Sequence, residues 1–340
     1  MLKRATIIMA VLFIFTLALT GCQSSKNEAG SQNASKNGPD KSKWPKQLTA
    51  VCGPEGGSGF ALLSVWAPIV GKETGANLSV QATGGNVANT IMVNKNQADL
   101  GLTTSALAAE GLIGADWTNN QKLGNYRLVA VLQTYVAQYY GMSKRNIKSI
   151  DDLNGKHISV GNAGSGSDTW SRRVLKTLNI NPGKISNLAP GQGNGLLKDG
   201  LLDVQAVFGS MPHNAIVELM TTNDVTVVGL GKEKSEQFAA KYPGLIVYEI
   251  PAGTYKNQKE PIYSIAEPVV LIANKDLPDD LVYEITKATF EKQNGLVAGS
   301  KPFKEVKIQD AGKGSIMLHP GAYKYYMEKG IKIPDKIAPK

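Results

Sequence analysis

Residues 48–70 read LTAVCGPEGGSGFALLSVWAPIV, and this stretch decides the fold class. Its first four residues are an apolar run that is typical of a short buried strand. A glycine-rich loop follows over residues 53–59, and the apolar residues of 60–70 then recur with a helical period. Strand, glycine loop and helix in this order are the repeating unit of α/β proteins.

The same unit recurs twice downstream. A strand is predicted at residues 78–82, followed by the turn Thr83-Gly84-Gly85-Asn86 and a helix over 87–93. Another strand is predicted at residues 97–102, leading through Thr103-Thr104-Ser105 into a helix over 106–113. Three consecutive units favour a mostly parallel sheet with helices on both faces.

A second series of elements begins after two predicted strands at residues 126–132 and 139–142, which flank a crossing into a second lobe. The elements predicted in that lobe are a short helix at 149–153, strand 157–160, helix 169–178, a helix ending at 196–200, strand 206–208, helix 212–220, and strands 225–230 and 245–250 that complete a second small sheet. Residues 263–273 then return the chain to the first lobe, where 279–294 form a helix.

Two α/β lobes with a cleft between them are therefore expected. Lobe 1 comprises residues 44–136 and 265–340, and lobe 2 comprises residues 137–264. In open α/β sheets, ligands bind beyond the carboxyl ends of the strands. Every glycine turn of the predicted units lies at such an end, which makes the cleft the expected binding site.

The N-terminus predicts export. Lys3 and Arg4 precede an uncharged apolar run, and residues 19–22 read LTGC, which is typical of a lipoprotein signal peptide over residues 1–21. Cys22 is the predicted site of lipidation, by palmitate or a similar acyl chain, and residues 22–43 form a polar, disordered tether. A transmembrane helix is the alternative, but the apolar run is short for a bilayer of about 30 Å. The expected location is the outer face of the cell membrane.

Composition argues against several function classes. The net charge is +9, but the basic residues are dispersed and carry no nucleic-acid motif. With Cys22 lipidated, Cys52 has no partner for a disulfide. The histidines, His157, His213 and His319, have neither metal-ligand nor catalytic spacing and are expected to be structural. We therefore expect no metal, no cofactor and no enzymatic activity.

Four turns at predicted helix starts are candidates for binding an anion, because free N–H groups and the helix dipole attract negative charge there. The alternative is that these residues only cap helices and permit turns. The candidate residues are Gly57, Ser58, Gly59, Thr83, Gly84, Gly85, Asn86, Thr104, Ser105, Ser165, Gly166 and Ser167. Tyr135, Tyr139 and Tyr140 either pack at the hinge or form a cleft wall, and Tyr135 is taken as a candidate.

In its ordered motifs the chain resembles the TAXI family, the extracytoplasmic solute receptors of TRAP (tripartite ATP-independent periplasmic) transporters. The motifs that carry the resemblance lie between residues 48 and 330 and are GGSG at 56–59, VQATGGNVAN at 80–89, ADLGL at 98–102, DDLNGK at 151–156, GNAGSGS at 161–167, IPAGTY at 250–255, VYEITK at 282–287 and LHPGA at 318–322.

This resemblance implies a type II periplasmic-binding-protein fold that closes around a small carboxylate, such as glutamate, glutamine or a related C5 acid. It also implies delivery of the ligand to TRAP permease subunits in the membrane, and the receptor is expected to be a monomer. In the first loop, residues 52–61 depart from the family pattern, so Glu55 is either a solvated charge or a counter-ion for a ligand ammonium.

Two other functions remain open. One is a binding protein that presents its ligand to a sensor kinase or to an ATP-driven importer. The other, more remote, is a lipoprotein hydrolase that uses a serine nucleophile.

Overall fold

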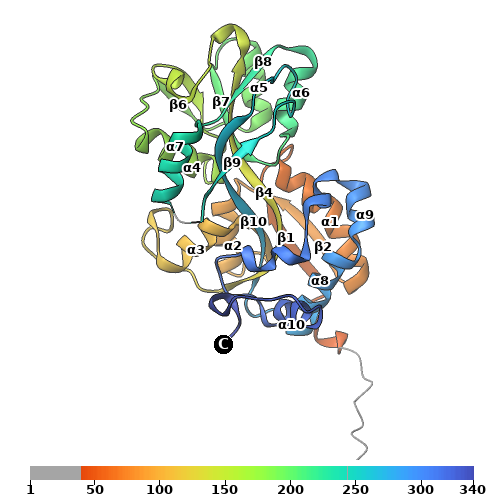
Figure 1. The fold of residues 1–340 in the computed structure, drawn as a ribbon. Coiled ribbons are helices and arrows are strands. Elements are labelled where there is room, and N and C mark those ends of the chain that lie inside the picture. Colours follow the sequence, from red (N-terminus) through yellow and green to blue (C-terminus); the bar gives the residue numbers. More distant parts are fainter. Residues whose placement is uncertain (1–39, 243) are drawn as a thin grey trace, which may run out of the picture. The chain divides into compact units, whose positions relative to one another are not determined.

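The computed structural model describes residues 40–242 and 244–340 (Figure 1). The predicted signal peptide, the lipidation site Cys22 and most of the predicted tether lie outside these residues. The end of the predicted tether is ordered instead: Lys41–Lys43 form a 3-10 helix, with the Asp40 side chain accepting a hydrogen bond from the Ser42 N–H at 3.2 Å. Trp44 is buried, so the folded body begins where the sequence predicts.

Three strand–helix units form the first half of the sheet. In chain order they are β1 (Gln47–Cys52), α1 (Ser58–Thr74), β2 (Asn77–Ala82), α2 (Asn86–Asn94), β3 (Leu100–Thr104) and α3 (Ser105–Ile113). Strand β1 pairs in parallel with both β2 and β3. The predicted strand, loop and helix order is confirmed here, with boundaries that differ by a few residues.

The second half of the sheet repeats this strand order. Its elements are β5 (His157–Ser159), α4 (Gly166–Thr177), β6 (Lys184–Ser186), α5 (Pro190–Lys198), β7 (Val204–Gly209), α6 (Asn214–Thr222), β8 (Val225–Val228), α7 (Lys232–Lys241) and β9 (Ile246–Ile250). Strand β5 pairs in parallel with β6 and β7, so the order β6-β5-β7 mirrors β2-β1-β3.

Two long strands, β4 (Tyr126–Met142) and β10 (Ile262–Asn274), connect the halves (Figure 1). The prediction of two separate strands at 126–132 and 139–142 is wrong, because β4 is continuous. The polar residues Gln133 and Thr134 suggested a break, but they pair with Val269 and Pro268 of β10 inside the sheet.

The prediction of a second, separate sheet is also wrong. Strand β8 pairs with β4 and β9 pairs with β10, so the described residues form one ten-stranded sheet in the order β2-β1-β3-β10-β4-β7-β5-β6 with β8 and β9 alongside. Because β4 and β10 run antiparallel to their partners, the sheet is mixed rather than mostly parallel. The predicted fold class, an α/β fold of the type II periplasmic-binding-protein kind, is confirmed.

The C-terminal helices pack on the first half. They are α8 (Asp279–Glu291), α9 (Gln293–Gly299) and α10 (Pro320–Glu328), and they replace the single helix predicted over 279–294. The Trp66 indole of α1 donates to the Thr289 hydroxyl of α8 at 2.9 Å, and the Phe290 ring stacks on that of Tyr325 with centroids 6.2 Å apart. These buried contacts join elements that are more than 200 residues apart in the sequence.

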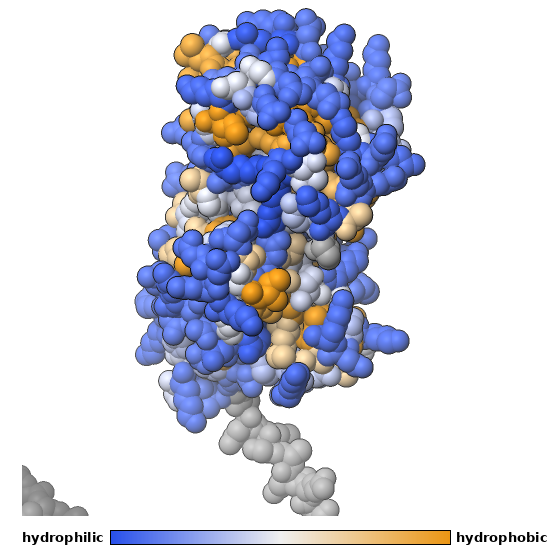
Figure 2. Space-filling model, turned by 90° about the vertical axis from the view of Figure 1, so that its left-hand side faces the viewer, coloured by the Kyte–Doolittle hydropathy of each residue, from blue (hydrophilic) through white to orange (hydrophobic). Residues whose placement is uncertain are grey.

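Short 3-10 helices make several of the remaining connections: η1 (Lys41–Lys43), η2 (Asp116–Thr118), η3 (Ser143–Arg145), η4 (Ile150–Leu153), η5 (Lys301–Glu305), η6 (Ile308–Lys313) and η7 (Asp335–Ile337). On the face shown in Figure 2, hydrophilic residues predominate and apolar residues form patches between them. In the described part of the chain, no helix is both long enough and apolar enough to cross a membrane.

Candidate ligand-binding site

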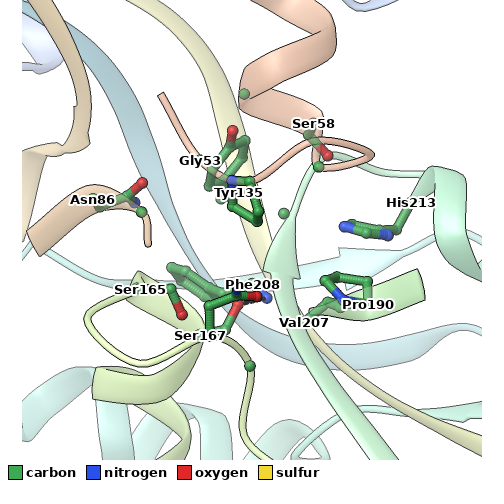
Figure 3. A pocket seen from close by; sticks show the side chains of 18 of the residues that line it. Gly53, Ser58, Asn86, Tyr135, Ser165, Ser167, Pro190, Val207, Phe208 and His213 are labelled. Atoms are coloured by element: carbon green, nitrogen blue, oxygen red, sulfur yellow. Dashed lines mark hydrogen bonds between the residues drawn. The ribbon is translucent and has the colours of Figure 1, made fainter. Parts of the chain in front are cut away.

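A cavity of about 60 Å³ lies where the carboxyl ends of β1, β5 and β7 meet the starts of several helices (Figure 3). A buried water molecule needs roughly 10 to 15 Å³ of such space, so the cavity holds a molecule several times that size. The residues lining it are Gly53, Pro54, Gly57, Ser58, Gly59, Gly85, Asn86, Leu102, Tyr135, Gly161, Asn162, Ser165, Gly166, Ser167, Pro190, Ala206, Val207, Phe208, Gly209 and His213.

Five helices begin at this cavity. Gly57, Gly85, Ser165 and His213 are the N-cap residues of α1, α2, α4 and α6, and Pro190 is the first residue of α5. The side chains of Ser165 and His213 cap their own helices, whereas Gly57 and Gly85 have no side chain that could do so. Since the N–H groups of a first helical turn have no partner within the helix, the starts of α1 and α2 offer donors to a ligand.

Most of the predicted site residues are brought together here. Gly57, Ser58, Gly59, Gly85, Asn86, Tyr135, Ser165, Gly166 and Ser167 all line the cavity, although they come from four separate segments of the chain. Helix α4 begins at Gly166, three residues earlier than predicted, because Ser165 accepts a hydrogen bond from the Asp168 N–H at 3.1 Å. This cap places Gly166 and Ser167 in the first turn of the helix.

Several of the lining hydroxyls are already bonded to the protein. The Ser58 Oγ of α1 lies 2.6 Å from the Ser210 Oγ that follows β7, and the Ser210 N–H donates to it at 3.3 Å. The Ser167 Oγ accepts from the Phe208 N–H at 2.8 Å. These serines therefore hold the cavity walls in place.

The glycine turns at 83–86 and 161–166 pack tightly against each other. Gly85 has φ +130°, which side chains rarely adopt, and a Cβ on it would lie 2.8 Å from the Ser165 Cβ. A Cβ on Gly84 would lie 2.7 Å from the Ala163 carbonyl oxygen. Both glycines are thus required for the close approach of two loops from different halves of the sheet.

Thr83, Gly84, Thr104 and Ser105 do not line the cavity, although the sequence places them among the candidates. The Thr83 hydroxyl lies 2.5 Å from the Cys52 carbonyl oxygen, and the Ser105 hydroxyl donates to Ser315 at 2.9 Å. The start of α3 faces a carboxyl group of the protein itself, because the Ala106 N–H donates to Glu267 Oε2 at 3.2 Å. That carboxyl group takes the place a ligand anion would need.

The tyrosines separate into two roles. Tyr135 lines the cavity, and its hydroxyl lies against Gly59, where a Cβ would be 3.3 Å away. Tyr139 and Tyr140 are fully buried outside the lining, and the Tyr140 hydroxyl donates to Asn194 Oδ1 at 2.8 Å. Packing therefore accounts for two of the three.

His213 lines the cavity, although the sequence predicts a structural histidine (Figure 3). Its side chain is only 4% exposed, and burial lowers its pKa to about 4, so the ring is neutral at pH 7. Nδ1 accepts from the Ala215 N–H at 3.3 Å, which leaves the proton on Nε2. The available signal was its position after strand β7 and at the start of a helix, as at the other turns.

No residue lining the cavity has an acidic or basic side chain. Glu55, considered as a counter-ion for a ligand, is exposed and lies outside the lining. In the described part of the chain, no group of three or more His, Cys, Asp or Glu side chains is placed to hold a metal ion. The cavity is thus a neutral chamber that helix N-termini make electropositive.

Three solved structures that resemble this chain are all extracytoplasmic or sensor proteins by title. They are an ABC uptake transporter substrate-binding protein from Streptococcus pneumoniae with bound histidine (16% identity, TM-score 0.49, covering 78% of this chain and 95% of that chain), MatC from Rhodopseudomonas palustris with bound malate (14%, 0.49, 76% and 90%), and a histidine kinase sensor domain with similarity to periplasmic binding proteins (10%, 0.46, 77% and 97%).

A family model gives the assignment. The model described as the NMT1-like family matches residues 53–330, which include every residue that lines the cavity. Because this match spans most of the chain, the protein belongs to the NMT1-like family.

Proposed function

We propose that this protein is an extracytoplasmic solute-binding receptor that captures a small carboxylate. The observation that carries the proposal is the convergence of five helix starts on one cavity without charged side chains. Each helix N-terminus carries about half a positive charge, and several such ends favour a negatively charged group.

Closure of two lobes is the proposed mechanism. Residues 44–136 with 265–340 form one lobe, residues 137–264 form the other, and β4 and β10 connect them. Contacts between the two are present beside the cavity: the Ser58 and Ser210 hydroxyls are 2.6 Å apart, and the Val87 N–H donates to the Gly164 carbonyl at 3.2 Å. A ligand that touches both lobes only when they meet favours the closed state.

The proposed partner is the membrane permease of a TRAP transporter of the TAXI type, which would recognise the closed receptor. Lipid attached to Cys22 would hold the receptor at the outer face of the membrane. Support for this subtype comes from the ordered sequence motifs between residues 48 and 330. Transport assays with the co-encoded permease in vesicles would test it, since uptake should require both the receptor and an ion gradient.

Ligand binding by the mature chain is the first test. A thermal-shift screen against carboxylates and amino acids should identify a stabilising ligand, because a ligand at 100 times its Kd adds about 2.7 kcal/mol of stability. If no carboxylate stabilises a preparation shown to be free of co-purified ligand, the proposal is wrong.

Asn86→Asp should weaken carboxylate binding by at least about tenfold. Asn86 is the first residue of α2 and lines the cavity, so the variant places a negative charge where the ligand anion binds. The matched control is Asn77→Asp, an exposed position at the start of β2 outside the lining. Titration of both variants measures the effect, and equal affinities would argue against an anion at this helix start.

A further inference from the structure

Resting on the proposed function, we infer that the ligand is a small organic anion without an ammonium group, and that the His213 Nε2–H donates a hydrogen bond to it. The inference separates plain, oxo and hydroxy carboxylic acids from the amino acids of the same length. It follows from what the cavity contains and from where the nearest charged groups are engaged.

A ligand ammonium would meet a repulsive field. The starts of α1, α2, α4 and α6 direct the positive ends of their dipoles to the cavity. A buried charge requires a partner of opposite sign, because an unpaired one loses its hydration without compensation. The lining supplies no carboxylate for this role.

The nearest acidic groups are engaged elsewhere or point away. Asp168, in the first turn of α4, lies outside the lining and pairs with Arg172 at 2.6 Å. Glu55, on the first loop, is exposed and outside the lining. The hydroxyl oxygens of Ser165 and Ser167 already accept hydrogen bonds from backbone N–H groups, which reduces their capacity to accept from an ammonium.

His213 is held so that it can act as a donor. Its own backbone N–H donates to the Tyr255 hydroxyl at 2.8 Å, and that hydroxyl donates to Gln138 Oε1. With Nδ1 accepting from Ala215, the neutral ring presents its Nε2–H on the cavity side. Gly209 leaves space for the ring, because a Cβ there would lie 2.5 Å from the His213 Cδ2.

Matched ligand pairs test the selectivity. Titration calorimetry of the mature chain at pH 7.5 compares succinate with aspartate, glutarate with glutamate, and 2-oxoglutarate with glutamate. We expect at least one acid to bind and its amino counterpart to bind at least about 100-fold more weakly. Amino acids that bind as tightly as their counterparts would overturn this inference alone, whereas the absence of binding by every acid would overturn the proposed function as well.

The variant His213→Asn tests the donor. Asparagine is a good N-cap, so the variant retains the acceptor for α6 while removing the Nε2–H. Because a hydrogen bond to a charged group contributes more than a neutral one, affinity for the bound acid should fall about 10- to 100-fold. His213→Gln, which restores a donor of similar reach, should recover part of the loss.

His319→Asn is the matched control. His319 is also buried, and its Nδ1 accepts from the Gly321 N–H at 3.3 Å at the start of α10, outside the cavity lining. This variant should bind the acid as the unmodified protein does, and His157→Asn serves as a second control if His319→Asn fails to fold. Unchanged affinity in folded His213→Asn would overturn the assigned role of His213.

Discussion

Glu267 is a fully buried carboxyl group on β10 that contacts both halves of the sheet. Its Oε1 accepts from the Trp170 Nε1–H of α4 at 2.7 Å, and its Oε2 accepts from the Ala106 N–H of α3 at 3.2 Å. Burial raises its pKa from 4.5 to about 8, despite these donors. Between these values the folded protein holds a proton that the unfolded chain releases.

Stability should therefore decrease as pH rises from about 4.5 to about 8, and Glu267→Gln should remove this decrease. A tenfold difference in acid strength is worth about 1.4 kcal/mol, so the contribution at pH 8 is about 4 kcal/mol. Denaturant unfolding at pH 5, 7 and 9 measures it: relative to the unmodified protein, the variant should gain stability at each step. A constant difference would show that Glu267 titrates alike in both states.

At the scale of elements, helices α3 and α4 are joined by one arginine. Arg173 of α4 donates to both carboxylate oxygens of Glu110 on α3, at 2.8 and 3.0 Å, and to Asp116 at 3.1 Å. The guanidinium also lies 4.7 Å from the Trp170 ring centroid. A lysine cannot make this two-point contact, because its ammonium is a single charge centre.

Arg173→Lys should therefore weaken ligand binding about 5- to 10-fold, since α3 and α4 lie on opposite sides of the proposed closure. Arg172→Lys is the neighbouring control: Arg172 is half exposed and pairs with Asp168 within α4. The affinity of each variant for the ligand found in the screen measures the effect. Equal losses in both variants would mean that the contact between α3 and α4 does not contribute to closure.

At the scale of the whole molecule, closure depends on the close approach of the glycine turns at 83–86 and 161–166. Gly84→Ala should oppose it, because the new Cβ would lie 2.7 Å from the Ala163 carbonyl oxygen. Gly124→Ala is the control, since a Cβ there meets nothing within 4 Å. Small-angle scattering should show a ligand-dependent decrease in radius of gyration for the control and a smaller decrease for Gly84→Ala. The same decrease in both would contradict the proposed closure.

Local patterns predict much of this chain. Apolar strands, glycine turns and periodic helices are set by neighbouring residues, so the six elements from β1 to α3 follow from the sequence with small boundary errors. The same patterns predict that Ser58, Asn86 and Ser165 belong to one site, because the carboxyl ends of neighbouring strands share an edge of the sheet.

Tertiary structure decided the rest. The continuity of β4 depends on β10, which pairs with Gln133 from more than 130 residues away, so no local signal could show it. Thr104 and Ser105 carry the same turn signal as the lining residues, but Glu267 occupies the start of their helix. His213 reaches the cavity because β7 lies beside β4 in the sheet. Sequence alone determined which helix starts could attract an anion, and packing between distant segments determined which of them meet, because those contacts exist only once the sheet has formed.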